Sequence, residues 1–263
     1  MSILASDLDR TLLPNGKEPY EKKTYTQLKK ILIHNNIELI YVTGRREVQV
    51  KQAIKQYPIP KPSYIISMVG TKIHTYSRGT FIEDTGWQKE LAQQWKHILA
   101  KDIIELLKDI PEIWEQGKQS NNQFKQSYYA KVDSKKQTIK QKISRRLQKN
   151  NIPYSFTYSI DAPRNIAQID IMPPKANKNE ALLYLLKKLN VKKKEVMTSG
   201  DSGNDLAMLL GGYKSVLVAN AKDVVKKEYI SLAKEKRLSK KIYVAKSCYA
   251  QGILDGLAYH KFI

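Results

Sequence analysis

Short apolar runs alternate with amphipathic segments over the first third of the chain and again over the last third. In the first third, the runs that predict strands lie at residues 3–6, 37–42 and 64–67, with a hairpin at 71–82. Between the first two runs, Tyr25, Leu28 and Leu32 recur at the spacing of one helical face. Alternating strands and helices are typical of α/β proteins, so we expect a Rossmann-like, doubly wound parallel sheet with helices on both faces.

The pattern changes between residues 85 and 164, where the three tryptophans, Trp87, Trp95 and Trp114, all lie. This stretch predicts a helix at 88–107, a strand at 127–132, a charged helix at 134–149 and a strand at 154–159. Strands predicted after it lie at 166–172, 195–199 and 215–219. We therefore expect a discontinuous core, residues 1–84 and 165–263, with an inserted α+β domain at 85–164. We expect the tryptophans to pack in the core or at a domain junction rather than to form sugar platforms.

Four polar clusters each follow a predicted strand or precede a predicted helix. They are Asp7-Leu8-Asp9-Arg10-Thr11, Thr43-Gly44-Arg45, Lys178 alone, and Gly200-Asp201-Ser202-Gly203-Asn204-Asp205. In an open α/β sheet, ligands bind beyond the carboxyl ends of the strands. The four clusters are therefore expected to meet at one edge of the sheet, although they lie far apart in the sequence.

The acidic residues of these clusters predict a metal site. Four carboxylates cannot lie close together while ionised unless a cation neutralises them. The four are Asp7, Asp9, Asp201 and Asp205. Oxygen ligands without histidine or cysteine favour Mg²⁺ as the cofactor.

Donors suited to phosphate oxygens surround these carboxylates. They are the Thr43 hydroxyl, the Gly44 backbone, the Lys178 ammonium and the Asn204 amide. In this interpretation Asp7 attacks phosphorus and forms an acyl phosphate, and Asp9 transfers protons to the leaving group and from the hydrolytic water. Mg²⁺ and Lys178 neutralise charge on the phosphate oxygens.

In this order, the motifs Asp-x-Asp-x-Thr, Thr-Gly-Arg, a lone Lys and Gly-Asp-Ser-Gly-Asn-Asp resemble those of the haloacid-dehalogenase-like (HAD) superfamily, subfamily IIB. The branch of sucrose-phosphate and mannosylglycerate phosphatases is particularly similar, also at residues 69–71, 169–173, 218–221 and 250–257. The resemblance implies a C2-type cap for the insert, with Asp7 as the nucleophile and Asp9 as the acid/base. It also implies that Thr43 and Lys178 hold phosphate. The late aspartate pair then holds Mg²⁺, Asp201 directly and Asp205 largely through the outer shell.

The predicted insert departs from the family pattern. Its segment 121–128 resembles a cap stretch that in the family carries Glu-Gln ahead of Lys-x-Ser-Tyr. Lys125 matches the lysine, whereas the Glu-Gln pair is missing. We therefore expect the chemistry to transfer better than specificity for sucrose, with a phosphorylated sugar as the substrate and a sucrose-phosphate-like disaccharide as one candidate. Lys125 and Arg45, which borders the phosphate loop, are candidate substrate contacts.

The charge of the chain allows two interpretations. Its 263 residues include 46 Lys and Arg against 25 Asp and Glu, a net charge of +21. Such a balance is typical of nucleic-acid-binding proteins, but it also attracts small anionic substrates. Because the lysines are spread along the chain, we favour the second interpretation and expect no nucleic-acid partner.

The apolar runs are too short to cross a membrane, and we expect no signal peptide and a cytoplasmic protein. The single cysteine, Cys248, excludes a disulfide within the chain. Two alternatives to a phosphatase stay open at this point. One is a sugar phosphomutase, and the other is a basic nucleic-acid-binding protein on a phosphatase scaffold.

Overall fold

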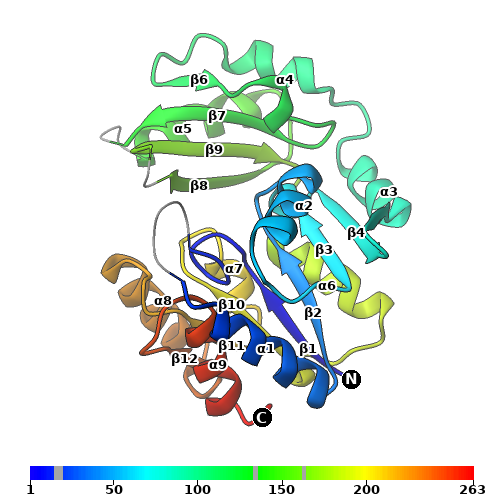
Figure 1. Ribbon diagram of the computed structural model, residues 1–263. Helices are drawn as coiled ribbons and strands as arrows, with labels where there is room; N and C mark the ends of the chain where they lie inside the picture. Colours follow the sequence, from blue (N-terminus) through cyan, green and yellow to red (C-terminus); the bar gives the residue numbers. More distant parts are fainter. Residues whose placement is uncertain (15–19, 133–135, 162–163) are drawn as a thin grey trace. The chain divides into compact units, whose positions relative to one another are not determined.

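The computed structural model describes residues 1–14, 20–132, 136–161 and 164–263, and this chain divides into two units (Figure 1). Unit 1 consists of Met1–Asp84 and Lys178–Ile263, and unit 2 consists of Thr85–Asn177. The chain was predicted to return to the core between residues 164 and 165, but it returns to unit 1 between Asn177 and Lys178.

The strand at 166–172 explains this correction. As β9 (Ile166–Met172), it pairs antiparallel with β7 (Gln126–Lys131) and β8 (Ser155–Asp161) in the sheet of unit 2. Its apolar pattern predicts a buried strand correctly. The pattern does not reveal which sheet the strand joins, because the same alternation suits either one.

The sheet of unit 1 has eight strands in the order β12-β11-β10-β1-β2-β3-β4-β5. The strands are β1 Ser2–Ser6, β2 Ile37–Val42, β3 Tyr64–Ser67, β4 Lys72–Ser77, β5 Thr80–Glu83, β10 Val196–Gly200, β11 Lys214–Leu217 and β12 Ile242–Val244. Neighbours from β12 to β3 run parallel, and β4 and β5 add an antiparallel hairpin at one edge. The predicted α/β class with a mainly parallel sheet is confirmed.

Helices cover both faces of this sheet, as the central strand shows. Ile3 and Leu4 point to opposite faces of β1, and both side chains are fully buried. The helices of unit 1 are α1 Lys22–His34, α2 Glu47–Gln56, α6 Lys178–Lys188, α7 Leu206–Leu209, α8 Asp223–Glu235 and α9 Tyr249–Tyr259. Its 3₁₀ turns are η1 Met68–Gly70, η3 Lys193–Glu195 and η4 Ser239–Lys241. The predicted apolar face of α1 is buried, with Tyr25 and Leu28 in a core shared with α9.

Unit 2 is an antiparallel sheet with helices, in the order β6-β7-β9-β8. Its remaining elements are α3 Thr85–Gln94, α4 Ala100–Leu107, β6 Ile113–Glu115, η2 Lys118–Ser120 and α5 Lys136–Lys149. The helix predicted at 88–107 is thus two helices, because the chain turns at Trp95, whose indole N–H donates to the Pro153 carbonyl at 2.7 Å. Helix α5 buries Ile139, Ile143 and Leu147, and the first two residues of its predicted span, Ser134 and Lys135, lie outside the described residues.

The three tryptophans have different surroundings. Trp87 and Trp95 are buried in unit 2, as core residues are. Trp114 on β6 is 44% exposed, and its ring lies 6.2 Å from that of Tyr129, so Trp114 is not a core residue. Within the described ranges, no helix combines the length and apolar character needed to span a membrane.

Candidate active site

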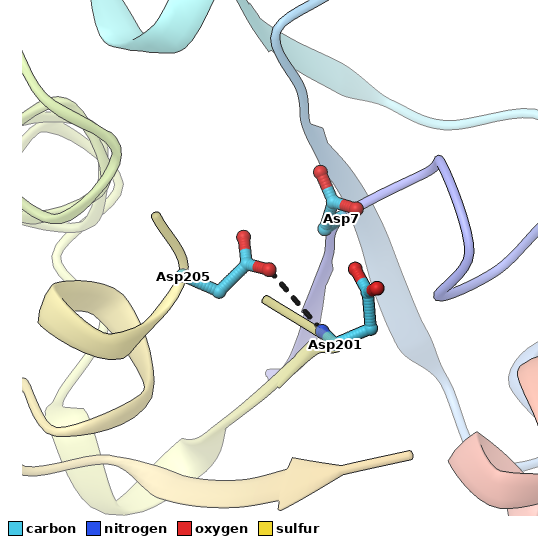
Figure 2. Close-up of side chains that lie close together, drawn as sticks. All are labelled: Asp7, Asp201 and Asp205. Atoms are coloured by element: carbon cyan, nitrogen blue, oxygen red, sulfur yellow. Dashed lines mark hydrogen bonds between the residues drawn. The ribbon is translucent and has the colours of Figure 1, made fainter. Parts of the chain in front are cut away.

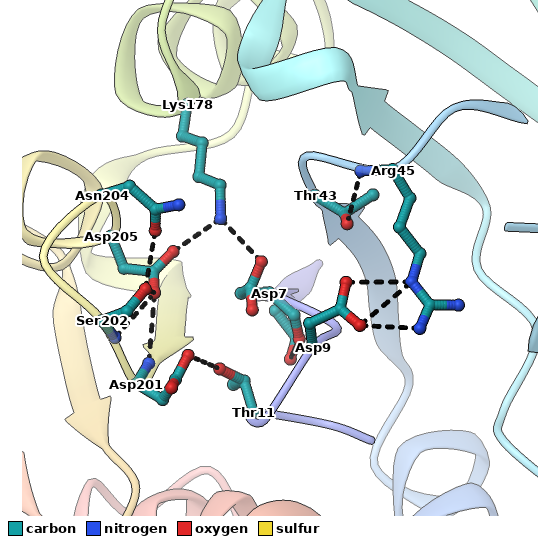
Figure 3. A network of polar contacts seen from close by, with 11 residues as sticks. Asp7, Asp9, Thr11, Thr43, Arg45, Lys178, Asp201, Ser202, Asn204 and Asp205 are labelled. Atoms are coloured by element: carbon teal, nitrogen blue, oxygen red, sulfur yellow. Dashed lines mark hydrogen bonds and ion pairs between the residues drawn. The ribbon is translucent and has the colours of Figure 1, made fainter. Parts of the chain in front are cut away.

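The central parallel strands bring the polar clusters of unit 1 together (Figure 3). Asp7 follows β1, and its N–H donates to the Ser199 carbonyl of β10 at 3.1 Å. On the other side of β1, Thr43 follows β2, and its N–H donates to the Ile66 carbonyl of β3 at 2.8 Å. Because parallel strands end at the same edge, residues separated by nearly 200 positions in the sequence share one site.

Lys178, the first residue of α6, bridges two carboxylates. Its Nζ lies 2.6 Å from Asp7 Oδ1 and 2.6 Å from Asp205 Oδ1, and the side chain is 2% exposed. Burial lowers the pKa of Lys178, but Asp205 and Asp7 more than offset burial, so its pKa is raised overall. The ammonium therefore stays charged and holds the two carboxylates toward each other.

Asp7, Asp201 and Asp205 form a buried group of carboxylates (Figure 2). Each offers one oxygen, and these oxygens all lie within 4.8 Å of one another. Burial raises the pKa of Asp7, and although Lys178 opposes it, Asp205 and Asp9 add to it, so that the pKa is about 7. Burial, Asp205 and Asp7 likewise raise the pKa of Asp201 well above its usual range. This concentration of negative charge around oxygen donors fits a divalent cation such as Mg²⁺.

Asp9 does not belong to this group. It was predicted as a fourth acidic residue of the metal site, but its carboxylate is paired with Arg45 instead. The Arg45 guanidinium approaches to 2.6 Å. Burial lowers the pKa of Arg45, whereas the hydrogen bonds and charge of Asp9 raise it, and the net direction is upward. The sequence placed Asp9 beside Asp7, but the direction of its side chain is a tertiary property.

The turn after β10 fixes the late aspartate pair. Asp205 Oδ2 accepts hydrogen bonds from the N–H groups of Asp201 and Ser202, at 3.2 and 3.1 Å, and from the Ser202 hydroxyl at 3.0 Å. Asn204 Oδ1 lies 2.8 Å from the same hydroxyl oxygen, so the two acceptors share its single proton. The carboxylate of Asp205 therefore closes the turn while its other oxygen faces Lys178.

The predicted phosphate loop follows β2, on the other side of β1 from this turn (Figure 3). The Thr43 hydroxyl oxygen accepts the N–H of Arg45 at 3.1 Å, which leaves the hydroxyl proton to be donated. Thr43 is fully buried, whereas Gly44 is exposed. Their roles toward phosphate remain predictions, as does that of Asn204.

Two residues near Asp201 had no predicted role. Thr11 Oγ1 donates to Asp201 Oδ1 at 3.3 Å, and Arg10 Nε lies 3.4 Å from Asp201 Oδ2. Arg10 has a positive φ of 61°, a strained conformation for a residue with a side chain. Asn220 supports it by donating from Nδ2 to the Arg10 carbonyl at 2.6 Å. The first motif contained Arg10 and Thr11, and the family resemblance covers 218–221, but neither shows that Asn220 contacts Arg10.

Lys125, the candidate substrate contact in unit 2, is buried. Its Nζ lies 2.7 Å from Asp170 Oδ1 and donates to the Ser120 carbonyl at 2.9 Å. Its side chain is 7% exposed. These contacts of the ammonium lie within unit 2, and the role of Lys125 toward substrate stays a prediction.

Comparisons with known proteins cover nearly the whole chain. The family described as sucrose-6F-phosphate phosphohydrolase matches residues 1–261. A protein of Nitrosococcus oceani described as an HAD-like hydrolase is 33% identical over 264 residues, which cover 98% of this chain and 71% of that protein. Sucrose-phosphatase 2 of Nicotiana tabacum is 29% identical over 262 residues, covering 98% of this chain. This chain matches only 58% of the tobacco protein's length.

A solved structure has a similar fold. The X-ray structure of the sucrose-phosphatase from Synechocystis sp. PCC6803, in complex with sucrose and phosphate, matches with a TM-score of 0.82 and 24% identity. The match covers 99% of this chain and 98% of the other. At this identity the likeness shows the fold alone.

Proposed function

The chain belongs to the sucrose-6F-phosphate phosphohydrolase family, as its motifs predicted, and from this premise we propose that it is a magnesium-dependent phosphatase acting on a phosphorylated sugar through an aspartyl-phosphate intermediate. One observation carries the proposal. Asp7 lies in a buried group with Asp201 and Asp205, and Lys178 contacts Asp7 and Asp205. A carboxylate between a cation and a metal-ligand pair is well placed to attack an anionic ester.

The reaction has two steps. In the first, a carboxylate oxygen of Asp7 attacks phosphorus, the bond from phosphorus to the sugar oxygen breaks, and Asp9 gives that oxygen its proton. In the second, Asp9 takes a proton from water, the water oxygen attacks phosphorus, and the bond to Asp7 breaks. The products are the free sugar and inorganic phosphate, and both aspartates return to their starting states.

The remaining residues hold the phosphoryl group. Lys178 fixes the attacking carboxylate and neutralises charge on a phosphate oxygen, and the Thr43 hydroxyl donates its proton to another. Mg²⁺ held by Asp7, Asp201 and Asp205 would supply further charge neutralisation at the phosphate. Removal of one such donor typically costs about 100- to 1000-fold in rate.

The substrate class follows from the relatives. The tobacco relative is named a sucrose-phosphatase, and the similar fold was solved with sucrose and phosphate. We take a sucrose-phosphate-like disaccharide phosphate as the first candidate, with unit 2 as the C2-type cap that contacts the sugar. The missing Glu-Gln pair at 121–128 makes other sugar phosphates worth equal testing.

A panel assay tests the proposal. Phosphate release is measured with sucrose 6-phosphate, other disaccharide phosphates and hexose phosphates, each with Mg²⁺ and with a chelator. We expect release that needs Mg²⁺, is lost in Asp7→Asn, and leaves a phosphoryl group on Asp7 in acid-quenched samples. Formation of a phosphate isomer without free phosphate would show a phosphomutase instead. Salt-sensitive binding to random RNA without any hydrolysis would show a nucleic-acid-binding protein.

A further inference from the structure

Arg45 donates hydrogen bonds to both oxygens of the Asp9 carboxylate (Figure 3). Its Nε donates to Oδ2 at 2.9 Å and to Oδ1 at 3.1 Å, and its Nη2 donates to Oδ1 at 2.6 Å. A planar guanidinium bound in this way fixes the position and the plane of a carboxylate, which a lysine cannot do.

The orientation of the Asp9 carboxylate depends on these hydrogen bonds. Across the described ranges, Arg45 is the one side chain that donates a hydrogen bond to the Asp9 carboxylate. The Asp9 side chain is 34% exposed, so without Arg45 it would be free to turn into solvent. An acid/base group must lie within hydrogen-bond reach of the oxygen that it protonates.

Two hydrogen bonds from η1 hold the backbone around Arg45. The Arg45 carbonyl accepts the N–H of Met68 at 3.1 Å, and the Thr43 carbonyl accepts the N–H of Val69 at 3.1 Å. Met68 and Val69 have positive φ angles of 49° and 62°, which costs about 1–2 kcal/mol for each residue with a side chain. A turn this strained persists only where its surroundings fix it, so Arg45 reaches Asp9 from a rigid base.

Among the described residues, the Arg45 guanidinium donates hydrogen bonds to Asp9 and to no other carboxylate of the site. Asp7 instead pairs with the ammonium of Lys178. This pairing gives Arg45 a role other than the expected contact with substrate.

We propose that Arg45 is a positioning residue for Asp9, holding the carboxylate where it passes a proton to the leaving oxygen, and that it is not a phosphate ligand. This inference rests on the proposed function. Positioning Asp9 and binding phosphate are two different roles for Arg45. A loss of activity alone would not distinguish them, because an Arg45 variant would be slow in either case.

Esters whose leaving groups differ in acidity distinguish the two roles. A sugar alkoxide leaves only if it is protonated, whereas p-nitrophenolate leaves without help, so a misplaced Asp9 slows the first step for the sugar phosphate alone. The second step, in which Asp9 takes a proton from water, is slowed for both esters. We expect Arg45→Gln to slow release of the sugar in a single turnover by about 100-fold or more and to change the single-turnover burst of p-nitrophenolate little. Inhibition by inorganic phosphate, which reports binding alone, should stay near wild type. Arg45→Lys, which keeps the charge without the two-point grip, should show the same difference.

Three further variants sharpen the test. Asp9→Asn should reproduce the difference between the two esters, and the double variant Arg45→Gln/Asp9→Asn should be no slower than Asp9→Asn alone, because both changes remove one function. Arg78→Gln, at the exposed turn between β4 and β5, controls for the lost charge and should behave as wild type.

Equal losses in the first-step rate on both esters, with weaker inhibition by inorganic phosphate, would overturn the inference and leave the proposed function standing. Additive losses in the double variant would do the same. Circular dichroism and melting temperatures establish that each variant is folded, and if Arg45→Gln does not fold, Arg45→Lys decides. A wild-type protein that hydrolyses neither ester overturns the proposed function and this inference with it.

Discussion

Asp205 occupies the space that a side chain on Gly200 would need. A Cβ at Gly200 would lie 2.6 Å from the Cβ and 2.8 Å from the Cγ of Asp205. The obstructing atoms are next to the backbone and cannot turn away, and the Asp205 carboxylate also closes the turn to Asp201. Glycine at 200 is therefore a condition for the geometry of the late aspartate pair.

Gly200→Ala should displace that pair. We expect the free energy of unfolding to fall by about 1–3 kcal/mol, the range for overpacking, and the Mg²⁺ concentration for half-maximal activity to rise. Thermal denaturation and phosphate release at graded Mg²⁺ measure the two effects. Gly203→Ala is the matched control, since a Cβ there meets nothing within 4 Å. Equal behaviour of the two variants would contradict the steric argument.

Lys178→Met should destabilise the site in the absence of metal. The substitution leaves Asp7 and Asp205 facing each other without the buried ammonium, and breaking a buried pair typically costs about 3–5 kcal/mol. We expect a lower melting temperature that Mg²⁺ partly restores, because a ligand that binds only the folded state stabilises it. Lys188→Met removes an ion pair with Asp84 from a lysine that is 59% exposed, and it should cost about 1 kcal/mol or less. A melting temperature for Lys178→Met equal to that of Lys188→Met would refute this account.

His260 should make stability depend on pH. Its Nε2 lies 3.1 Å from the Ser215 carbonyl, and burial lowers its pKa below the ordinary 6.5, with the Ser215 bond opposing and Lys214 reinforcing the shift. A base whose folded pKa is lowered contributes stability that is complete above the unfolded pKa. That contribution is lost as the pH falls below about 6.5, because the unfolded chain then binds more protons. The free energy of unfolding measured at pH 7.5 and 5.5 should therefore fall more for wild type than for His260→Gln. A slope unchanged by the substitution would rule out this histidine as the cause.

Asn220→Asp should weaken the metal site through Arg10. The amide donates to the Arg10 carbonyl at 2.6 Å and accepts the Tyr249 N–H at 3.3 Å. An aspartate keeps the acceptor but turns the first contact into repulsion, at a cost of about 1–3 kcal/mol. Because Arg10 pairs with Asp201, Mg²⁺ should stabilise the variant less than wild type in a thermal shift titration. Asn36→Asp, at an exposed turn with φ 51°, tests the same chemical change elsewhere and should leave the titration unaltered.

Local pattern alone determined much of the fold. The apolar runs of β1, β2 and β3 and the buried face of α1 follow from periods that a strand or a helix imposes on its own residues. The position of each polar cluster directly after a strand also follows from the chain, and parallel pairing then brings the clusters to one edge.

Tertiary structure decided which partners those elements and side chains take. The pattern of β9 marks a buried strand but does not select its sheet, and only pairing with β7 and β8 places it in unit 2. Asp9 turns to Arg45, 36 positions away, and Arg10 meets Asn220, 210 positions away. The physical reason is that a period reports which face of an element is buried, whereas a hydrogen-bond partner depends on rotamers and on packing between segments that the sequence order does not bring together.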